Sequence, residues 1–314
     1  MTKPLYYSLI SESTGYIYTI RFKVVPLESD MILPPFTSKV VKSIAYTLPC
    51  FSQIRGLYES KITFKPVTFK VLRRGSRRLY VDGESNEIIR ARIGEPLVGE
   101  IAVFTDKPLD LGLLSECNTK ARIPNLTSQL LIEIANVTFE NINTITLNLD
   151  EAELIKITFH TPTLIPVKLM TPPALKGSKL VKNIEKLYRL TITPAYICSE
   201  AARLWLALVK DVNPAQSPTP YYLGRICDIT IGEVDVQLKP TTTIYGKDEK
   251  GNTLKVRGIT GHIVYKILTP RLILTVDKLL ALTTKLGLGK SRSIGFGEVE
   301  TKSQGTQGKL KNTT

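Results

Sequence analysis

Glycines and cationic residues are interleaved in one short segment near the end of the chain, a combination typical of phosphate binding. Residues 285–298 read Lys-Leu-Gly-Leu-Gly-Lys-Ser-Arg-Ser-Ile-Gly-Phe-Gly-Glu. Glycines lack a side chain, so backbone N–H groups can approach a ligand and positive φ angles are allowed. We therefore expect a phosphate to contact the glycines and cations of this segment, namely Gly287, Gly289, Gly295, Gly297, Lys285, Lys290 and Arg292.

Two common nucleotide-binding motifs do not fit this segment. A P-loop would need glycine at the position of Thr284, and a dinucleotide fingerprint that starts at Gly287 would need glycine at position 292. Both motifs also run from strand to helix, whereas here a predicted helix over 271–286 comes first and a predicted strand over 295–300 follows. Because a helix C-terminus carries partial negative charge, binding would depend on side-chain cations and loop amides. A flexible surface turn is the alternative interpretation.

A second group of reactive side chains lies on a predicted helix that begins at Thr37 or Ser38 and reaches Leu48. At 100° per residue, Lys39, Lys42 and Tyr46 lie within about 60° of one another. The opposite face is apolar and consists of Val41, Ile44, Ala45 and Leu48. Two ammonium groups and a phenol therefore share one face, which is either a site or simply the solvent side.

Basic residues are also concentrated between positions 65 and 78, where no acidic residue occurs. The members are Lys65, Lys70, Arg73, Arg74, Arg77 and Arg78. Because the cluster follows a predicted strand and contains Gly75, we interpret it as a strand end and hairpin tip from which arginines can reach phosphates. A solvated basic loop is the alternative.

The charge of the whole chain favours a polyanionic partner. Among 314 residues, 42 Lys and Arg minus 28 Asp and Glu leave a net charge of +14. Nucleic acid is the first candidate and an anionic membrane surface the second. We expect no membrane segment, because charged residues interrupt every long apolar run. The N-terminus has no apolar signal core, so we expect a cytoplasmic protein.

Metal and disulfide chemistry have little support in the sequence. Cys50, Cys117, Cys198 and Cys227 are widely separated, and His160 and His262 are the only histidines. We expect buried structural thiols and neither a metal site nor a cofactor.

The predicted elements describe an α+β protein of two tandem ferredoxin-like (βαββαβ) domains. In the first domain, residues 1–149, we expect strands at 16–26, 61–72, 97–105, 129–139 and 143–149, while residues 106–128 are ambiguous between helix and loop. In the second, residues 150–301, strands at 153–159, 224–238 and 253–268 accompany helices at 193–212 and 271–286 and a last strand to Thr301. Residues 302–314 are predicted to be a disordered basic tail.

The whole pattern resembles a known family. The loop Gly-Leu-Gly-Lys-Ser-Arg-Ser-Ile-Gly-Phe-Gly-Glu (287–298) resembles the glycine-rich loop of the repeat-associated mysterious protein superfamily of CRISPR systems. Segments 32–42 (Ile-Leu-Pro-Pro-Phe-Thr-Ser-Lys-Val-Val-Lys) and 255–262 (Lys-Val-Arg-Gly-Ile-Thr-Gly-His) are similar to its CRISPR repeat-processing endoribonucleases of the crenarchaeal type. The resemblance spans about residues 16–301.

This resemblance implies metal-independent cleavage of CRISPR precursor RNA within each repeat. The ribose 2′-hydroxyl attacks the adjacent phosphate, leaving a 2′,3′-cyclic phosphate and a 5′-hydroxyl, and the repeat RNA stays bound. Many members carry a histidine near the first helix, which this chain lacks; lysines replace it in some. The implied roles are proton transfer or charge stabilisation by Lys42 and Lys65, and phosphate positioning by Lys39, Tyr46 and Arg257. The loop residues and Arg73, Arg74, Arg77 and Arg78 would bind RNA.

The missing histidine also leaves a second reading open, a non-catalytic RNA-binding subunit of a CRISPR effector complex. Effector subunits or a second copy of the chain are then possible partners. A general RNA-binding ferredoxin-like protein is a weaker alternative, because the sequence lacks that family's aromatic signature. A metal-dependent nuclease lacks a grouping of Asp, Glu and His with ligand spacing.

Overall fold

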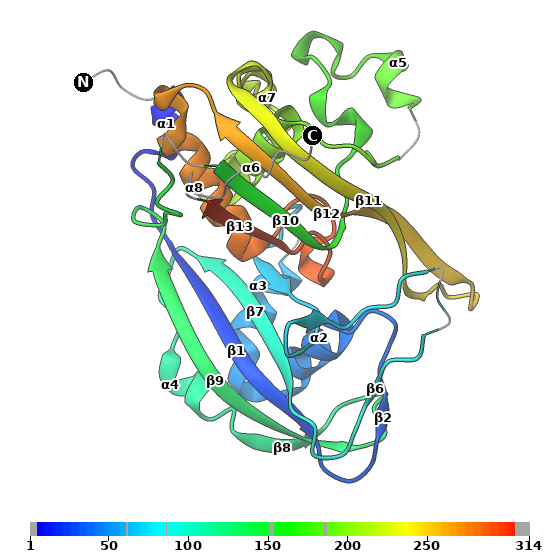
Figure 1. The fold of residues 1–314 in the computed structure, drawn as a ribbon. Helices are drawn as coiled ribbons and strands as arrows, with labels where there is room; N and C mark the ends of the chain where they lie inside the picture. Colours follow the sequence, from blue (N-terminus) through cyan, green and yellow to red (C-terminus); the bar gives the residue numbers. More distant parts are fainter. Residues whose placement is uncertain are drawn as a thin grey trace, which may run out of the picture.

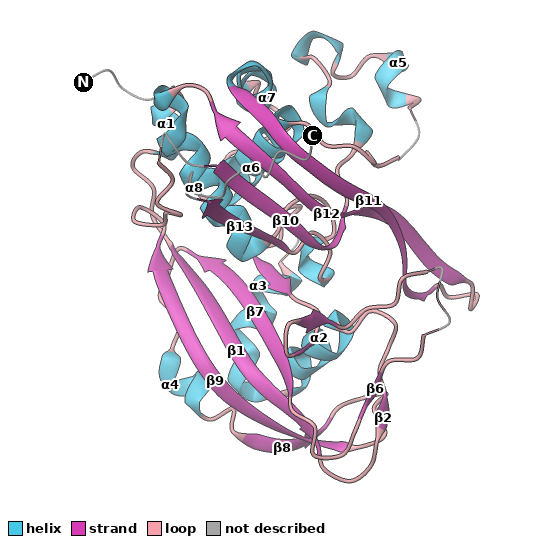
Figure 2. Cartoon of the chain, in the orientation of Figure 1, coloured by secondary structure: helices cyan, strands magenta, loops and turns pink. Residues whose placement is uncertain are grey.

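Two antiparallel sheets, one from each half of the chain, form the framework of the protein (Figures 1 and 2). The computed structural model describes residues 5–60, 62–83, 85, 87–150, 154–184 and 187–304. Helices pack on one face of each sheet, which confirms the predicted α+β class.

The sheet of the first half has, among the described residues, seven strands. They are β1 (Tyr16–Pro26), β3 (Val67–Phe69), β4 (Arg73–Arg74), β5 (Arg77–Arg78), β7 (Leu97–Thr105), β8 (Thr119–Arg122) and β9 (Gln129–Asn141). The path β5-β4-β7-β1-β9-β8 places β1 between β7 and β9. Two helices, α2 (Ser38–Thr47) and α3 (Ser52–Glu59), connect β1 to β3 through the short helix η1 (Pro49–Phe51). The ambiguous segment 106–128 holds only α4 (Leu111–Ser115) and β8, so the second helix of the predicted motif is reduced to one turn.

The second half follows the βαββαβ order more completely. Its strands are β10 (Leu154–Thr163), β11 (Ile231–Lys247), β12 (Thr253–Ile267) and β13 (Val299–Gln304), in the order β11-β12-β10-β13. Helices α6 (Pro194–Leu208) and α7 (Thr219–Thr230) join β10 to β11, and α8 (Pro270–Leu286) joins β12 to the glycine-rich segment. An insertion before α6 carries η2 (Val167–Met170), η3 (Pro173–Leu175) and α5 (Lys179–Lys182).

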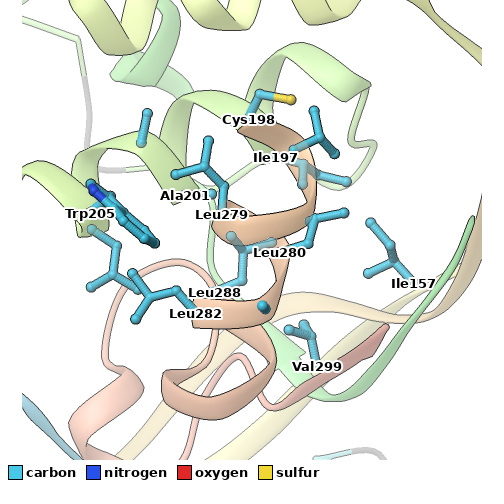
Figure 3. Packing of buried hydrophobic residues seen from close by; sticks show 14 of the residues in the cluster. Ile157, Ile197, Cys198, Ala201, Trp205, Leu279, Leu280, Leu282, Leu288 and Val299 are labelled. Carbon is cyan, nitrogen blue, oxygen red and sulfur yellow. The ribbon is translucent and has the colours of Figure 1, made fainter. Parts of the chain in front are cut away.

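A stripe of apolar residues on α6 forms the centre of this half, as its spacing predicts (Figure 3). Ile197, Ala201 and Trp205 are buried against Leu279 and Leu280 of α8. Burying each large side chain contributes about 1.5–3 kcal/mol, so this stripe fixes α6 and α8 on the sheet.

The N-terminal residues of the chain pack against the second half. The short helix α1 (Tyr7–Ile10) lies beside α8 and places Leu9 and Ile10 in the core of the second half. The hydroxyl of Thr275 also donates a hydrogen bond to the Leu5 carbonyl at 2.6 Å. The change from one sheet to the other falls between β9 and β10, and the 149/150 boundary stays a prediction.

Four predictions of elements were wrong. Of the strand predicted at 61–72, only Val67–Phe69 is a strand among the described residues. Residues 143–149 form a loop whose Ile145 and Leu149 are buried in the second core, so their apolar pattern reflects packing rather than a strand. Residues 224–230 belong to α7, because Leu223 and Cys227, four positions apart, pack together against α6. Positive φ angles at Gly295 and Gly297 delay the last strand until Val299.

The expectation of free thiols is also wrong. Cys50 is bonded to Cys117, and Cys198 to Cys227, across 67 and 29 residues. The first disulfide joins η1 to the end of α4, and the second joins α6 to α7. Both pairings depend on tertiary proximity, which wide spacing in the sequence concealed.

The last described residues of the chain belong to a strand. Residues 302–304, predicted to be disordered, extend β13, while residues 305–314 lie outside the described residues. Among the described helices, none has the length and apolar character needed to span a membrane.

Candidate active site at the junction of the two halves

Two of the predicted lysines converge on a tyrosine that the sequence analysis did not select. The Lys42 ammonium donates a hydrogen bond to the Tyr58 hydroxyl at 2.9 Å and lies 4.5 Å from the centroid of its ring. The Lys65 ammonium lies 5.7 Å from the same centroid and donates a hydrogen bond to the Ser60 carbonyl. α2, α3 and the segment before β3 therefore bring Lys42 and Lys65 to one aromatic ring.

Tyr46 belongs to the same group. Its ring packs edge-on against Tyr58 with centroids 5.8 Å apart, and the Lys42 ammonium lies 5.4 Å from the Tyr46 centroid. Burial raises the pKa of the Tyr46 phenol, and the neighbouring Tyr58 and Glu59 add to this effect. A phenol with a raised pKa stays protonated near neutral pH, so Tyr46 is suited to donating a hydrogen bond rather than to accepting a proton.

Lys39 and Lys42 line a small cavity that both halves of the chain build. The cavity measures about 100 Å³ and is completed by Phe36, Ser38, Ile294 and Tyr245. Tyr245 comes from the end of the long β11–β12 hairpin, which reaches across to the first half (Figure 1). The Tyr245 ring rests on Phe296 of the glycine-rich segment, with centroids 5.8 Å apart. A phosphate group in this cavity would meet two ammonium groups and a phenol.

The glycine-rich segment forms the floor of this junction, with a function in packing that the sequence analysis did not predict. All four glycines are buried and have positive φ. A Cβ atom on Gly295 would lie 2.7 Å from the Ser38 Cβ, and one on Gly289 would lie 2.7 Å from the Leu164 carbonyl oxygen. Glycine is therefore required here by close contact with the protein itself.

Most of the backbone amides in this segment are also engaged within the protein. The amides of Leu288 and Gly297 donate to the carbonyls of Gly297 and Pro162, and the amide of Lys290 donates to Leu164. The Ser38 hydroxyl, at the start of α2, donates to the Ile294 carbonyl at 2.6 Å. These bonds tie the segment to α2 on one side and to β10 on the other.

Arg292 of the glycine-rich segment is buried and does not present its charge to solvent. Its guanidinium donates a hydrogen bond to the Leu286 carbonyl at 3.0 Å. Burial lowers the Arg292 pKa to about 10, against an opposing effect of Glu200. The exposed cation of the segment's tip is Lys290, whereas Lys285 is partly exposed and paired with Glu140 of β9.

The arginine hairpin exists as predicted, but acidic residues distant in sequence neutralise much of its charge. β4 and β5 form the hairpin, and Gly75 at its tip has φ of 58°. Arg74 pairs with Glu95, Arg77 with Glu87, and Arg78 with Glu298 at 3.0 Å. Among Arg73, Arg74, Arg77 and Arg78, the side chain of Arg77 has the largest exposed fraction, 61%.

Glu100 forms ion pairs with three cationic side chains at a cleft of about 170 Å³ between the two sheets. Arg21, Lys70 and Arg73 lie 2.7, 2.5 and 2.7 Å from its carboxylate. Burial alone would raise the Glu100 pKa, but Lys70, Arg21 and Arg73 outweigh it and lower the pKa to about 2. This cluster is a structural ion network across the first sheet.

Arg257 is separated from the lysines. It is exposed on β12 and pairs in register with Thr242, whereas the adjacent Val256 packs with Tyr245 and Phe296. Neighbouring residues of a strand point to opposite faces, so Arg257 lies on the far face from the junction. The structure therefore does not unite Arg257 with Lys42 and Lys65.

The two histidines are engaged in pairs away from the lysines. His160 lies 3.1 Å from Glu300, and burial together with Arg78 lowers its pKa. His262 lies 3.2 Å from Asp235. Within the described part of the chain, no group of three His, Cys, Asp or Glu side chains has the arrangement of a metal site.

Sequence reasoning missed two residues of this junction, Tyr58 and Tyr245. Tyr58 lies sixteen residues after Lys42 on a separate short helix, and Tyr245 comes from the other half. Nothing in their local sequence distinguishes them from other tyrosines. Only the contact between α2, α3 and the hairpin identifies them.

Comparisons with known proteins agree with this architecture. The family model described as "Cas6 N-terminal domain" matches residues 18–139, and that described as "CRISPR-associated endoribonuclease Cas6" matches residues 157–299. Two relatives from Saccharolobus solfataricus, CRISPR-associated endoribonuclease Cas6 1 and Cas6 2, are 28% and 27% identical over 90% of this chain and over 96% and 95% of theirs. A Thermus thermophilus Cas6 product complex superposes with a TM-score of 0.59 at 15% identity, covering 92% of this chain and 100% of that chain. The structural likeness supports the fold alone.

Proposed function

Since this chain belongs to the Cas6 family of CRISPR-associated endoribonucleases, which process CRISPR precursor RNA, we propose that Lys42 and Lys65 perform the cleavage. The supporting observation is that both ammonium groups approach the Tyr58 ring, and that Lys42 also lines the cavity that α2, the glycine-rich segment and Tyr245 enclose. A repeat phosphate would enter that cavity. The chain has no histidine on α2, so lysines take its place, and Lys42 and Lys65 are the two that share the Tyr58 ring.

The reaction that these residues can support is an internal transfer at one phosphate. The ribose 2′-oxygen forms a bond to phosphorus as the bond to the 5′-oxygen breaks, giving a 2′,3′-cyclic phosphate and a 5′-hydroxyl. One of the two lysines, in its neutral form, accepts the proton of the 2′-hydroxyl. The other, as an ammonium, stabilises the charge that develops on the phosphorane and donates a proton to the departing 5′-oxygen. Metal ions have no assigned step in this scheme.

The surrounding residues would position the RNA. Lys39 and Tyr245 line the cavity and can hold a phosphate oxygen, while Tyr46 donates a hydrogen bond from its protonated phenol. Arg257 faces away from the lysines, so we assign it to RNA held along the outer face of the hairpin.

The glycine-rich segment has a different task in this proposal. Arg292 and the four glycines hold α2 in place through Ser38 and Ile294. Lys290 and the exposed Arg77 are the cations of the loop and the hairpin that can reach RNA directly. Lys285, Arg73, Arg74 and Arg78 would contact RNA only by exchanging a carboxylate partner for a phosphate. Retention of the cut repeat follows if these contacts survive cleavage.

Single-turnover cleavage of a repeat RNA in excess EDTA tests the proposal. Lys42→Ala and Lys65→Ala are expected to slow cleavage about 1,000-fold, the middle of the range of roughly 10²- to 10⁴-fold for losing a proton-transfer group. Repeat RNA binding should change far less, because each variant removes one charge from a chain of net charge +14. The products of the wild type should carry a 2′,3′-cyclic phosphate.

Lys120→Ala is the matched control, since Lys120 is an exposed lysine on the edge strand β8. Wild-type cleavage rates in both Lys42→Ala and Lys65→Ala, with RNA binding intact, would refute the assignment. Tight binding without cleavage by the wild type would instead favour the RNA-binding subunit.

A further inference from the structure

A cationic cavity lies in the second half of the molecule, where the insertion before α6, α6 itself and the tip of the glycine-rich segment meet. It measures about 370 Å³, a size that suits a nucleotide. The insertion before α6 supplies Lys168 and Lys176, α6 supplies Arg203, and the tip of the glycine-rich segment supplies Lys290. No Asp or Glu occurs among the described residues that line it.

The lysines of this cavity keep their charge available. The Lys168 ammonium donates to the Lys182 carbonyl at 3.2 Å, and the Lys176 ammonium donates to the Ala215 carbonyl at 3.3 Å. Neither forms an ion pair with a carboxylate within the described parts of the chain. Arg203 is paired with Glu200 at 3.1 Å, so Lys168 and Lys176 are the cations that contrast with the largely paired side chains of the arginine hairpin. Carbonyl partners orient an ammonium without cancelling its charge, which is what phosphate binding needs.

A second cavity continues from the first toward the candidate catalytic lysines. It measures about 580 Å³ and shares Arg203, Pro214 and Ala215 with the first cavity. Its far wall is the segment from Ile62 to Phe64, and Lys65 is the next residue. Asp211 is the one carboxylate among its described lining residues. The two cavities together form a path from Phe64, the residue before Lys65, to Lys176, here called the Arg203 groove.

Flat side chains along this path suit unpaired bases. Tyr221 lines the first cavity and Phe64 the second, and the Arg203 guanidinium lies 5.5 Å from the Phe64 ring centroid. Aromatic rings and arginine planes stack with bases of any sequence, while nearby cations track the backbone. A small anion would bind only to the cations, and would neither extend along the groove nor contact its aromatic rings.

We propose that the Arg203 groove holds an unpaired stretch of RNA that flanks the cut site, with phosphates near Lys168 and Lys176 and a base on Tyr221. This inference rests on the proposed function, because the groove begins at Phe64, next to Lys65 in the chain. It assigns the insertion between β10 and α6, which the cleavage chemistry does not use, to substrate binding.

The test measures binding of repeat RNA by Lys168→Ala/Lys176→Ala as a function of salt. Affinity should fall roughly 10-fold at 0.1 M salt, and the slope of log K against log salt should become shallower by about 1.4, because two contacts to single-stranded phosphates are lost. Tyr221→Ala should weaken binding roughly 5- to 100-fold with the slope unchanged, since stacking carries no charge. Thermal unfolding of each variant verifies that the fold is intact.

RNA trimmed by a few nucleotides at one end provides the second arm. Trimming the end that occupies the groove should weaken wild-type binding and make it equal to that of the double variant. Lys120→Ala serves again as the surface-charge control. If the double variant and Tyr221→Ala both match this control on full-length RNA that the wild type binds and cuts, the groove is refuted while the proposed function stands. If the wild type neither binds nor cuts repeat RNA, the proposed function itself fails.

Discussion

The substitution Gly295→Ala tests whether the glycine-rich segment acts by packing against α2 or by contacting RNA directly. The φ of Gly295 is 95°, and a Cβ atom there would lie 2.7 Å from the Ser38 Cβ, 2.9 Å from the Ser38 Oγ and 3.0 Å from the Phe69 carbonyl oxygen. The unfavourable φ costs about 1–2 kcal/mol in Gly295→Ala. Crowding against backbone and β-carbon atoms adds about 1–3 kcal/mol, so we expect a loss of about 2–5 kcal/mol in the free energy of unfolding.

The matched control is Gly75→Ala at the tip of the arginine hairpin. Gly75 has a φ of 58°, and no described atom would lie within 4 Å of an added Cβ. This variant should therefore lose only the conformational term, about 1–2 kcal/mol. Urea unfolding measures both variants, and the difference between them isolates the crowding.

The same substitution should disturb the lysines through α2. Ser38 is the first residue of α2, and Lys39 and Lys42 lie within its next turn. A displacement of a few tenths of an ångström there should slow single-turnover cleavage by about 10-fold or more. Adding Ser38→Gly removes the clashing Cβ, so the double variant should be less destabilised than the sum of the single variants. Equal stability and equal cleavage in Gly295→Ala and Gly75→Ala would refute the reasoning.

Two further predictions concern stability. Glu100→Gln should lower the free energy of unfolding at pH 7 by about 3 kcal/mol, because the Glu100 pKa falls from an ordinary 4.5 to about 2 in the folded state. The wild type has this contribution above about pH 4.5 and loses it as the pH falls toward 2. The difference in free energy of unfolding between the wild type and Glu100→Gln, measured with urea, should therefore be smaller at pH 3 than at pH 7. An equal difference at both pH values would contradict the ion network. Dithiothreitol should destabilise the wild type, and Cys227→Ser should cost about 3–4 kcal/mol for its 29-residue separation from Cys198. An unchanged urea midpoint after complete reduction would show that neither disulfide contributes.

Local patterns were sufficient to predict most of the long strands and helices. β1 and β7 begin and end as predicted, because alternation over nine or more residues has one interpretation. α2 and α8 also lie close to their predicted bounds, since caps, prolines and apolar periodicity agree there. α7 was missed because its β-branched and aromatic residues favour a strand locally, and packing against α6 overrides that preference.

The charge of the chain, its two sheet motifs, the lysine face of α2 and the glycine-rich segment can be recognised from the sequence, because composition and periodicity are local properties. Which cations remain free depends on tertiary contacts. Acids such as Glu100, Glu95 and Glu298 come from distant positions to neutralise the arginine hairpin, while Arg292 turns inward. The structure likewise joined Lys42 to Lys65 through Tyr58 and paired the four cysteines. Such partners depend on distances across the fold, which spacing along the chain does not encode.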